Sequence, residues 1–228
     1  DLHRRRHSFP TRRSSDLART DQIKIVSMNR KHLFILAGIL LICLFTAYAV
    51  YHKYNKYLPT SAGEVSFPAP LTAAQLQSIR QNTPIDSIHV YKSQRYLVLQ
   101  HQNKIVRRYP IRLGFAPTGH KVQEGDGKTP EGRYVIDWRN PQSAFYKSLH
   151  VSYPNAKDQL KAQQLGVSAG GDIMIHGSAT ARQLKVLPNL MGYFPQKDWT
   201  WGCIAVRNMD IDEIWQLVNN DTVIEIHP

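Results

Sequence analysis

The feature that most constrains the fold of this chain is an uncharged run of 18 residues, Leu33–Val50 (LFILAGILLICLFTAYAV). As a helix with a rise of 1.5 Å per residue it would be about 27 Å long, close to the hydrocarbon thickness of a bilayer. A helix buried in a globular protein normally shows a polar face, and this run has none. The sequence therefore predicts a membrane anchor or a signal sequence, and either one exports the chain that follows.

The flanks of the run bear on its orientation and processing. The basic pair Arg30-Lys31 favours a cytoplasmic N-terminus, but two lysines on the other side, at 53 and 56, weaken this charge argument. Ala47-Tyr48-Ala49 resembles a cleavage site, so a cleaved signal peptide stays open as an alternative. Because the run is longer than a usual signal core, we expect an uncleaved signal anchor over residues 28–51.

The residues before the run carry little information about the fold. Asp1–Leu17 is rich in Arg and Ser and resembles a translated sequencing adapter, with a disordered basic arm as the alternative. We assign residues 1–27 to a disordered tail or artefact and expect Met28 to be the native start.

The net charge of +12 raises the question of nucleic-acid binding, which the distribution of charge answers. Residues 1–83 hold 12 of the 29 basic and 4 of the 17 acidic residues, a net charge of +8. The remaining chain carries only +4, so the excess belongs mostly to the N-terminal extension and not to a basic binding face. We therefore expect no nucleic-acid partner.

The chain after the apolar run divides into a linker and a folded domain. Residues 52–83 are polar with scattered Pro and predict a tether, in which Leu71–Gln81 forms a short helix. From residue 84 to 228, short β-type runs and turns predict a mainly β domain with a few short helices. Strands are expected at Ile85–Tyr91, Arg95–Gln100, Lys104–Leu113, Arg133–Asp137, Asp172–His176 and Thr222–Ile226.

Two further segments of the domain are predicted from turn and helix signals. Residues 141–171 are expected to be irregular or partly helical. The spacing of apolar residues predicts a helix over Asp210–Val218, opened by a capping box between Asp210 and Glu213.

Cys203 is the candidate nucleophile of the exported domain. The chain has 2 Cys, too few for a disulfide framework or a Cys-based zinc site, and Cys203 is the one beyond the apolar run. A buried hydrophobic role is the usual fate of a free cysteine. A thiol needs a base or a cation to become a thiolate, and His176, before Gly177, can supply the base if the fold brings it near.

Three motifs carry a family resemblance: Gly125-Asp-Gly-Lys-Thr-Pro-Glu-Gly132, Ile175-His176-Gly177, and Asp198-Trp-Thr-Trp-Gly-Cys-Ile-Ala-Val206 followed by Asn208. Their order and content resemble the L,D-transpeptidase (YkuD-like) catalytic domain family, in its Gram-negative branch. The resemblance covers Ile85–Pro228. It implies that domain's mainly β fold, no cofactor and no metal, and a role in cell-wall organisation.

The resemblance also implies roles for individual residues. Cys203 would attack the third residue of a peptidoglycan stem tetrapeptide, with His176 as general base and acid and the backbone at Gly177 orienting the imidazole. The expected oxyanion and substrate-binding residues are Gly202, Trp201, Thr200 and Tyr153, although an ordinary packed loop is the alternative for His150–Tyr153.

The expected partners follow from this chemistry. After D-Ala leaves, an amine acceptor resolves the acyl-enzyme, either a second stem peptide or the lysine of an outer-membrane lipoprotein. The resemblance places the domain in the periplasm, with the apolar helix as a single pass through the inner membrane. A hydrolase using water as acceptor and a non-catalytic wall-binding module are the alternatives.

The sequence departs from the commoner family motif at two places. Thr200-Trp201-Gly202 replaces Ser-His-Gly before the nucleophile, and Ala205 stands where an Arg is common, with Arg207 displaced by two positions. These departures leave the choice of acceptor open. Other chemistry is disfavoured: no H-E-x-x-H occurs, Val122 breaks a phosphate-loop pattern, and the carboxylates Asp126, Glu131 and Asp137 are expected in turns and on solvated faces.

Overall fold

The computed structural model describes residues 29–61 and 63–228 and divides the chain into two compact units, the first ending at Ala49 and the second covering Val50–Pro228. The predicted tail or artefact at residues 1–27, and Met28, lie outside the described residues. Each unit is described by itself.

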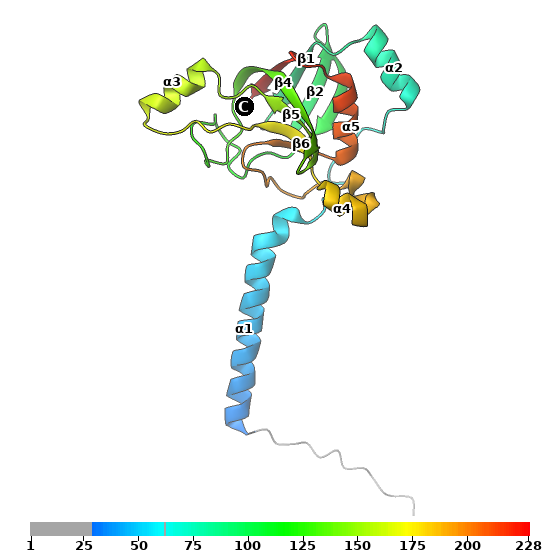
Figure 1. Ribbon diagram of the computed structural model, residues 1–228. Helices are drawn as coiled ribbons and strands as arrows, with labels where there is room; N and C mark the ends of the chain where they lie inside the picture. Colours follow the sequence, from blue (N-terminus) through cyan, green and yellow to red (C-terminus); the bar gives the residue numbers. More distant parts are fainter. Residues whose placement is uncertain (1–28, 62) are drawn as a thin grey trace, which may run out of the picture. The chain divides into compact units, whose positions relative to one another are not determined.

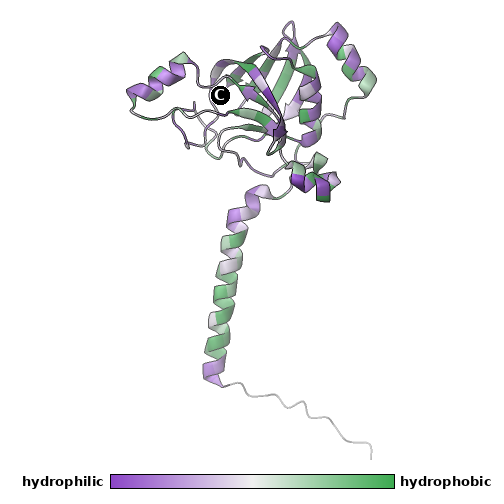
Figure 2. Ribbon diagram, viewed as in Figure 1, coloured by the Kyte–Doolittle hydropathy of each residue, from purple (hydrophilic) through white to green (hydrophobic). Residues whose placement is uncertain are grey.

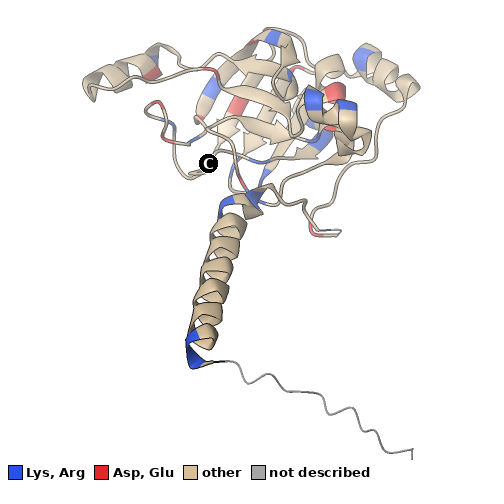
Figure 3. Cartoon of the chain, turned by 60° about the horizontal axis from the view of Figure 1, so that its bottom comes forward, with Lys and Arg blue, Asp and Glu red and all other residues tan. Residues whose placement is uncertain are grey.

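The apolar run forms the helix α1, Arg30–Tyr54, followed by a short 3-10 helix, η1, Asn55–Tyr57. None of its residues is buried, and its apolar residues cover the middle of the helix (Figure 2). Lys and Arg lie only toward its two ends (Figure 3). Within the described residues it is the one helix long and apolar enough to cross a membrane.

The second unit is built on a mixed eight-stranded sheet with the order β3-β2-β1-β8-β4-β5-β6-β7 (Figure 1). Its strands are β1 Ser87–Tyr91, β2 Tyr96–His101, β3 Lys104–Pro110, β4 Gly132–Ser143, β5 Tyr146–Val151, β6 Met174–Gly177, β7 Ile204–Val206 and β8 Val223–His227. The pairs β1–β8 and β6–β7 are parallel and the others antiparallel.

The long strand β4 joins two parts of the sheet. Gly132–Val135 pairs with β8, whereas from Ile136 onward the strand pairs with β5, and its register with β5 shifts twice. Such irregularities bend a strand and let one strand serve two partners. In the strand order, β6, which contains His176, and β7, which follows Cys203, lie at the opposite end of the sheet from β1, β2 and β3.

Alternate strand residues bury one face of the sheet beneath the helix α5, Asn208–Leu217. The core is aliphatic and includes Ile88, Leu99, Ile136, Leu149, Ile175, Ile204, Ile211, Ile214 and Ile224, all fully buried. Burying an aliphatic side chain contributes about 1.5–3 kcal/mol, so this core fixes the positions of β6 and β7.

Three further helices begin with capping boxes. They are α2 Ala73–Asn82, α3 Ala156–Gln164 and α4 Ala181–Val186, capped by Thr72, Asn155 and Thr180 respectively. A second 3-10 helix, η2, covers Pro188–Gly192. The helix predicted at Leu71–Gln81 is α2, and Leu76 and Ile79 pack it against the core.

The segment predicted as a tether makes contacts with the domain. The Thr60 hydroxyl and backbone amide both donate to the Phe194 carbonyl, at 3.1 and 2.9 Å, and the Leu71 amide donates to Glu213 at 2.7 Å. Phe67 packs edge-on against Phe194. Residues 57–61 and 63–71 thus contact the domain surface at several points.

The predicted start of the last helix was wrong. The helix α5 begins at Asn208, its N-cap is Arg207, and no side chain caps it. Asp210 instead forms a buried ion pair with Arg207, and Glu213 binds Arg107 and the Tyr109 hydroxyl. The spacing resembled a capping box, but two arginines bind these carboxylates in place of the helix backbone: Arg207, three residues before Asp210, and Arg107, which is distant in the chain from Glu213.

Two strands were not predicted. Residues 141–171, expected to be irregular or partly helical, contain the end of β4, all of β5 and the helix α3. The three residues of β7 are all buried, and a strand that short has no detectable alternation.

Candidate functional site

The strands β6 and β7 bring His176 and Cys203 into one region. His176 lies in β6 opposite Ala205, and Cys203 comes directly before β7. The Met174 amide donates to the Cys203 sulfur at 3.4 Å, so the thiol lies beside the residue two positions before His176. Because alternate residues of a strand share a face, Met174 and His176 project to the same side of β6.

Cys203 is a partly exposed thiol at the start of this strand. Its Sγ donates to the Asp172 carbonyl at 3.4 Å and accepts from the Met174 amide. Burial of the sulfur raises the pKa of the Cys203 thiol, and the Met174 hydrogen bond opposes this only in part. At neutral pH the resting group is therefore the thiol and not the thiolate.

His176 is 4% exposed and held between aromatic rings. Phe145 stacks on it with a centroid distance of 4.9 Å, and Trp199 meets it edge-on at 5.7 Å. The His176 Nδ1 lies 2.6 Å from the carbonyl oxygen of Gly177, which can only accept, so Nδ1 carries the proton. The lone pair is consequently on Nε2.

Burial lowers the pKa of His176 from 6.5 to about 4, with the Gly177 carbonyl opposing the shift. The imidazole is therefore neutral at pH 7 and able to accept a proton. Among the described residues, no hydrogen bond joins it to Cys203 directly. The resting arrangement is a neutral thiol and a neutral base, in which proton transfer must accompany attack on a substrate.

Gly177 and the residues after it are fixed by Asn208. The fully buried Asn208 amide oxygen accepts from the Ser178 and Ala179 amides, each at 2.9 Å, and its nitrogen donates to the Ala179 carbonyl. A Cβ on Gly177 would meet that amide oxygen at 2.7 Å, so this position requires glycine. The carbonyl that orients His176 is thereby held in place.

The turn before the nucleophile is fixed by hydroxyl groups and a glycine. Thr200 Oγ1 donates to the Cys203 carbonyl at 2.7 Å and accepts from the Gly202 amide at 3.2 Å. Gly202 has a φ of +128°, and a Cβ there would lie 2.5 Å from the Lys128 carbonyl. Thr129 Oγ1 donates to the Gly202 carbonyl at 2.8 Å, which ties the turn to the 125–132 loop.

An exposed aromatic pair lies next to this turn. The Trp201 side chain is 71% exposed and meets Phe115 edge-on at 5.0 Å, a ring that is itself 46% exposed. The Phe115 ring lies so close over Gly127 that a Cβ there would contact it at 2.4 Å. Two accessible rings thus lie beside the Thr200–Cys203 turn.

Sequence reasoning missed Phe115, Phe145 and Trp199 as neighbours of the site. Phe145 lies in the tight connection between β4 and β5, a region predicted to be irregular, and no local pattern indicates its contact with His176. Trp199 belongs to the motif quoted for the family but was given no role. Its indole nitrogen is buried and has no hydrogen-bond partner in the described part of the chain.

In the described structure, Tyr153 makes neither a hydrogen bond nor a ring contact with the residues around Cys203. It is 3% exposed, its hydroxyl donates to the Ala169 carbonyl at 3.1 Å, and its ring packs edge-on against Tyr134 and His120. The packed loop, weighed as the alternative for this residue, agrees with this environment.

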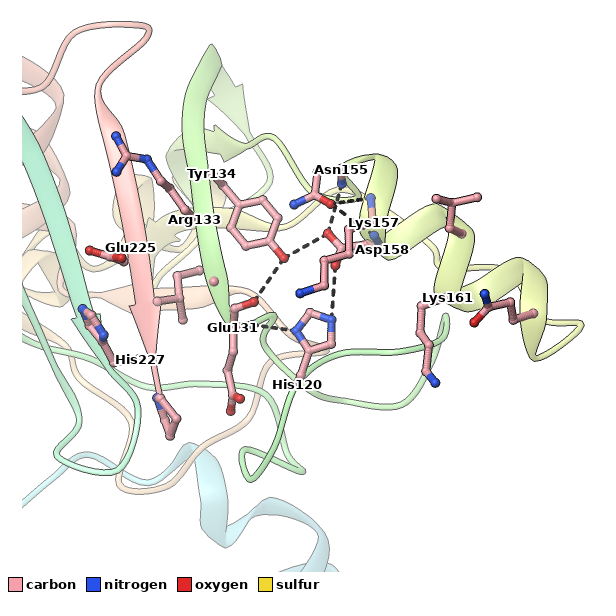
Figure 4. Close-up of a pocket in the computed structure, with 15 residues that line it drawn as sticks. His120, Glu131, Arg133, Tyr134, Asn155, Lys157, Asp158, Lys161, Glu225 and His227 are labelled. Atoms are coloured by element: carbon pink, nitrogen blue, oxygen red, sulfur yellow. Dashed lines mark hydrogen bonds and ion pairs between the residues drawn. The ribbon is translucent and has the colours of Figure 1, made fainter.

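A cavity of about 960 Å³ lies near that loop and is lined by neither Cys203 nor His176 (Figure 4). The polar groups at its centre form hydrogen bonds and an ion pair with one another. His120 Nδ1 accepts from the Glu131 amide at 2.9 Å, and its Nε2 lies 3.2 Å from Asp158, which also accepts from the Tyr134 hydroxyl. We assign these groups to the packing of α3 against the sheet.

The remaining predicted carboxylates have structural partners. Asp126 accepts from the amides of Val122, Gln123 and Lys128, as expected of a turn residue. Glu131 pairs with Lys92, and Asp137 lies 2.6 Å from His150 Nδ1.

A sequence model of the YkuD family, described as the L,D-transpeptidase catalytic domain, matches residues 85–226. This agrees with the resemblance found in the three motifs. YafK of Escherichia coli (strain K12), whose name assigns it provisionally to the L,D-transpeptidases, is 28% identical over 168 residues, 71% of this chain and 57% of YafK. The chain thus spans little more than half the length of the curated relatives it matches.

The solved structures to which the chain is similar include the following two. The helical cell shape determining protein Pgp2 of Campylobacter jejuni (K307A mutant) is 24% identical, with a TM-score of 0.48 over 66% of this chain and 52% of that one. An L,D-transpeptidase of Xylanimonas cellulosilytica is 14% identical, with a TM-score of 0.41 over 68% and 70% of the two chains.

Proposed function

The chain belongs to the L,D-transpeptidase (YkuD) catalytic domain family, and from this premise we propose that it is a cysteine-dependent peptidoglycan L,D-transpeptidase. In this proposal Cys203 is the nucleophile, and His176 is the general base and acid. The observation that carries it is the orientation of the buried His176, whose Nδ1 is bound to the Gly177 carbonyl so that Nε2 keeps its lone pair.

The first half-reaction forms a thioester. Cys203 Sγ attacks the carbonyl carbon of the third stem residue while its proton passes to His176 Nε2. Since both groups are neutral at rest, the proton moves as the carbon–sulfur bond forms. The tetrahedral intermediate collapses, the carbon–nitrogen bond to D-Ala breaks, and the imidazolium returns the proton to the leaving amine.

The second half-reaction consumes the thioester. An amine acceptor loses its proton to His176, attacks the thioester carbonyl and releases the Cys203 thiol. The acceptor is a second stem peptide or a lipoprotein lysine, and water in its place would make the enzyme a hydrolase of the same bonds. Backbone amides near Gly202 and Cys203 would stabilise the oxyanion, supported by the rigid turn that Thr200 and Thr129 hold.

The exposed Trp201–Phe115 pair gives this site a surface for the donor substrate. Aromatic rings offer a large apolar area to a binding partner. We assign the pair to substrate binding beside the nucleophile. The active domain works in the periplasm, and α1 serves as its anchor in the inner membrane.

The test is mass spectrometry of the full chain in detergent, incubated with a disaccharide-tetrapeptide. Dimers that lack one D-Ala, together with an acyl-enzyme mass, are expected for the native chain. Cys203→Ala should abolish both, and Cys43→Ala is the matched control because it removes the other cysteine of the chain. Chelators should have no effect on product formation.

Two other results would change the proposal. Tripeptide without dimers would indicate hydrolysis or a missing acceptor, and a lipoprotein that gains the mass of the disaccharide-tripeptide when it is added would identify the acceptor. Unchanged substrate and no acyl-enzyme would contradict the mechanism for this donor and favour a wall-binding module.

A further inference from the structure

A second cluster of chemistry-bearing side chains lies across the neighbouring strands β1 and β8. His89 of β1 is the register partner of Glu225 of β8, and His227 follows Glu225 by two residues. Alternate strand residues share a face, and Figure 4 shows Glu225 and His227 on the same side of β8. The parallel pairing therefore brings two imidazoles and a carboxylate together.

The distances within the cluster resemble those of a metal site. His89 Nδ1 lies 3.1 Å from His227 Nε2 and 3.6 Å from a Glu225 carboxylate oxygen. All three potential ligand atoms lie within 4.8 Å of one another. Two ligand atoms bound to one tetrahedral zinc ion at ordinary bond lengths lie about 3.3 Å apart.

We propose that His89, Glu225 and His227 bind a divalent transition-metal ion of the zinc class. Two imidazoles and one carboxylate suit zinc, copper and nickel better than calcium or magnesium, which prefer oxygen ligands. Three protein ligands leave one position of a tetrahedral ion for water. None of these side chains contacts Cys203 or His176 in the described structure, so this site is independent of the proposed catalysis.

The two imidazoles are held in place before any ion binds. Their rings are parallel within 4°, with centroids 5.5 Å apart, and Tyr91 stacks on His227 at 4.8 Å. All three ligands are partly exposed, so an ion can reach them from solvent. Because these side chains are already ordered, binding of an ion costs less conformational entropy.

Without a metal, the short nitrogen–nitrogen distance requires that one of the two facing atoms carries a proton and donates it to the other. This hydrogen-bonded pair is the competing explanation of the cluster. Glu225 helps to distinguish the two, because it forms no ion pair with its other register partner, Arg133 of β4, in the described part of the chain. Its carboxylate is left facing the histidines.

A bound ion would connect β1 to β8, the central strand that also pairs with β4. An ion that binds the folded state alone raises stability in proportion to the logarithm of its concentration. At a zinc concentration about 100-fold above Kd, the Tm of a domain of this size should rise by about 5 °C or more.

The test uses the full chain in detergent, without a histidine tag, in two titrations. Calorimetry measures the binding of Zn²⁺, and visible absorption measures the binding of Co²⁺. One ion per chain is expected, with the visible bands of tetrahedral Co²⁺ and no sulfur-to-cobalt charge transfer, which excludes Cys203 as the ligand. Glu225→Gln and His227→Ala should each weaken binding at least about 10-fold.

His101→Gln is the matched control, because His101 also lies beside a carboxylate, that of Asp86, but has no second imidazole. It should bind Zn²⁺ like the native chain. Binding that survives in Glu225→Gln and His227→Ala, while their metal-free Tm stays native, would overturn the proposal. So would the absence of binding at 100-fold excess zinc over protein, which would leave the hydrogen-bonded pair as the explanation.

Discussion

His176 and the His89–His227 pair show how one residue type serves different chemistry in two regions of the same sheet. His176 is 4% exposed, enclosed by aromatic rings and bound through Nδ1 to a backbone carbonyl, so a single nitrogen is left to move a proton. His89 and His227 are partly exposed and direct a nitrogen toward each other. A buried imidazole stays neutral and can act as a base. Two imidazoles that face each other and are open to solvent can bind a cation.

Cys203→Ala should have the largest effect on activity. Its effect should be confined to the site around Cys203 and His176. Loss of a nucleophile lowers turnover by about 10³-fold or more. Product formation followed by mass spectrometry should fall to background, while the Zn²⁺ affinity of the β1–β8 cluster stays native. A joint loss of both properties at native Tm would contradict the independence of the two regions.

His176→Gln should lower kcat by about 10²- to 10⁴-fold, the usual contribution of a general base. His89→Gln is the comparison variant at the other cluster and should leave kcat within about twofold of native. Steady-state kinetics on the disaccharide-tetrapeptide measure both. Equal losses in the two variants would remove the distinction between base and ligand.

The pH dependence of stability should also separate the regions. Burial holds the pKa of His176 at about 4 instead of 6.5, so between these values the unfolded chain binds the additional proton. Stability is therefore full above pH 6.5 and is lost as pH falls toward 4, by about 3 kcal/mol from this group. The fall in Tm between pH 7 and pH 4 should be smaller in His176→Gln than in the native chain. An equal fall in Tm would contradict the assignment.

Gly202→Ala tests whether the turn beside Cys203 is rigid. The φ of +128° and the Cβ contact of 2.5 Å with the Lys128 carbonyl require backbone movement, which costs about 1–3 kcal/mol. Tm and kcat should both fall. As a control, Gly171→Ala should change neither, because a Cβ there meets nothing within 4 Å.

Trp201→Ala should have the smallest effect on folding. The side chain is 71% exposed, so unfolding free energy should change by less than about 0.5 kcal/mol. If the ring binds donor substrate, kcat/KM should fall by up to about 10-fold, mainly through KM. Native kinetics would remove Trp201 from the substrate site and leave its contact with Phe115 as packing.

Much of the fold was predictable because local patterns and tertiary structure agree. The uncharged run forms α1, and the first three β-type runs form β1, β2 and β3. The mainly β fold class and the family resemblance are confirmed. The strand β5 and the three-residue β7 escaped prediction because cross-strand pairing and burial define them, with no repeating pattern of their own.

The site residues divide in the same way. Cys203, His176 and Gly202 were identified as candidates from motifs, and their chemical roles remain predictions. Phe145 could not be found in this way, because it contacts His176 across a hairpin that the sequence did not predict. Nor did any motif join His89 to His227, which lie 138 residues apart in the chain.

The sequence by itself determined an apolar helix, a mainly β fold class and the family, because each depends on composition, short-range order or motifs; export of the domain and cysteine chemistry remain predictions. The tertiary structure decided the protonation of His176, the packing of residues 57–61 and 63–71, and the cluster at β1 and β8. These depend on burial and on strand register, which are set by contacts between residues far apart in the chain.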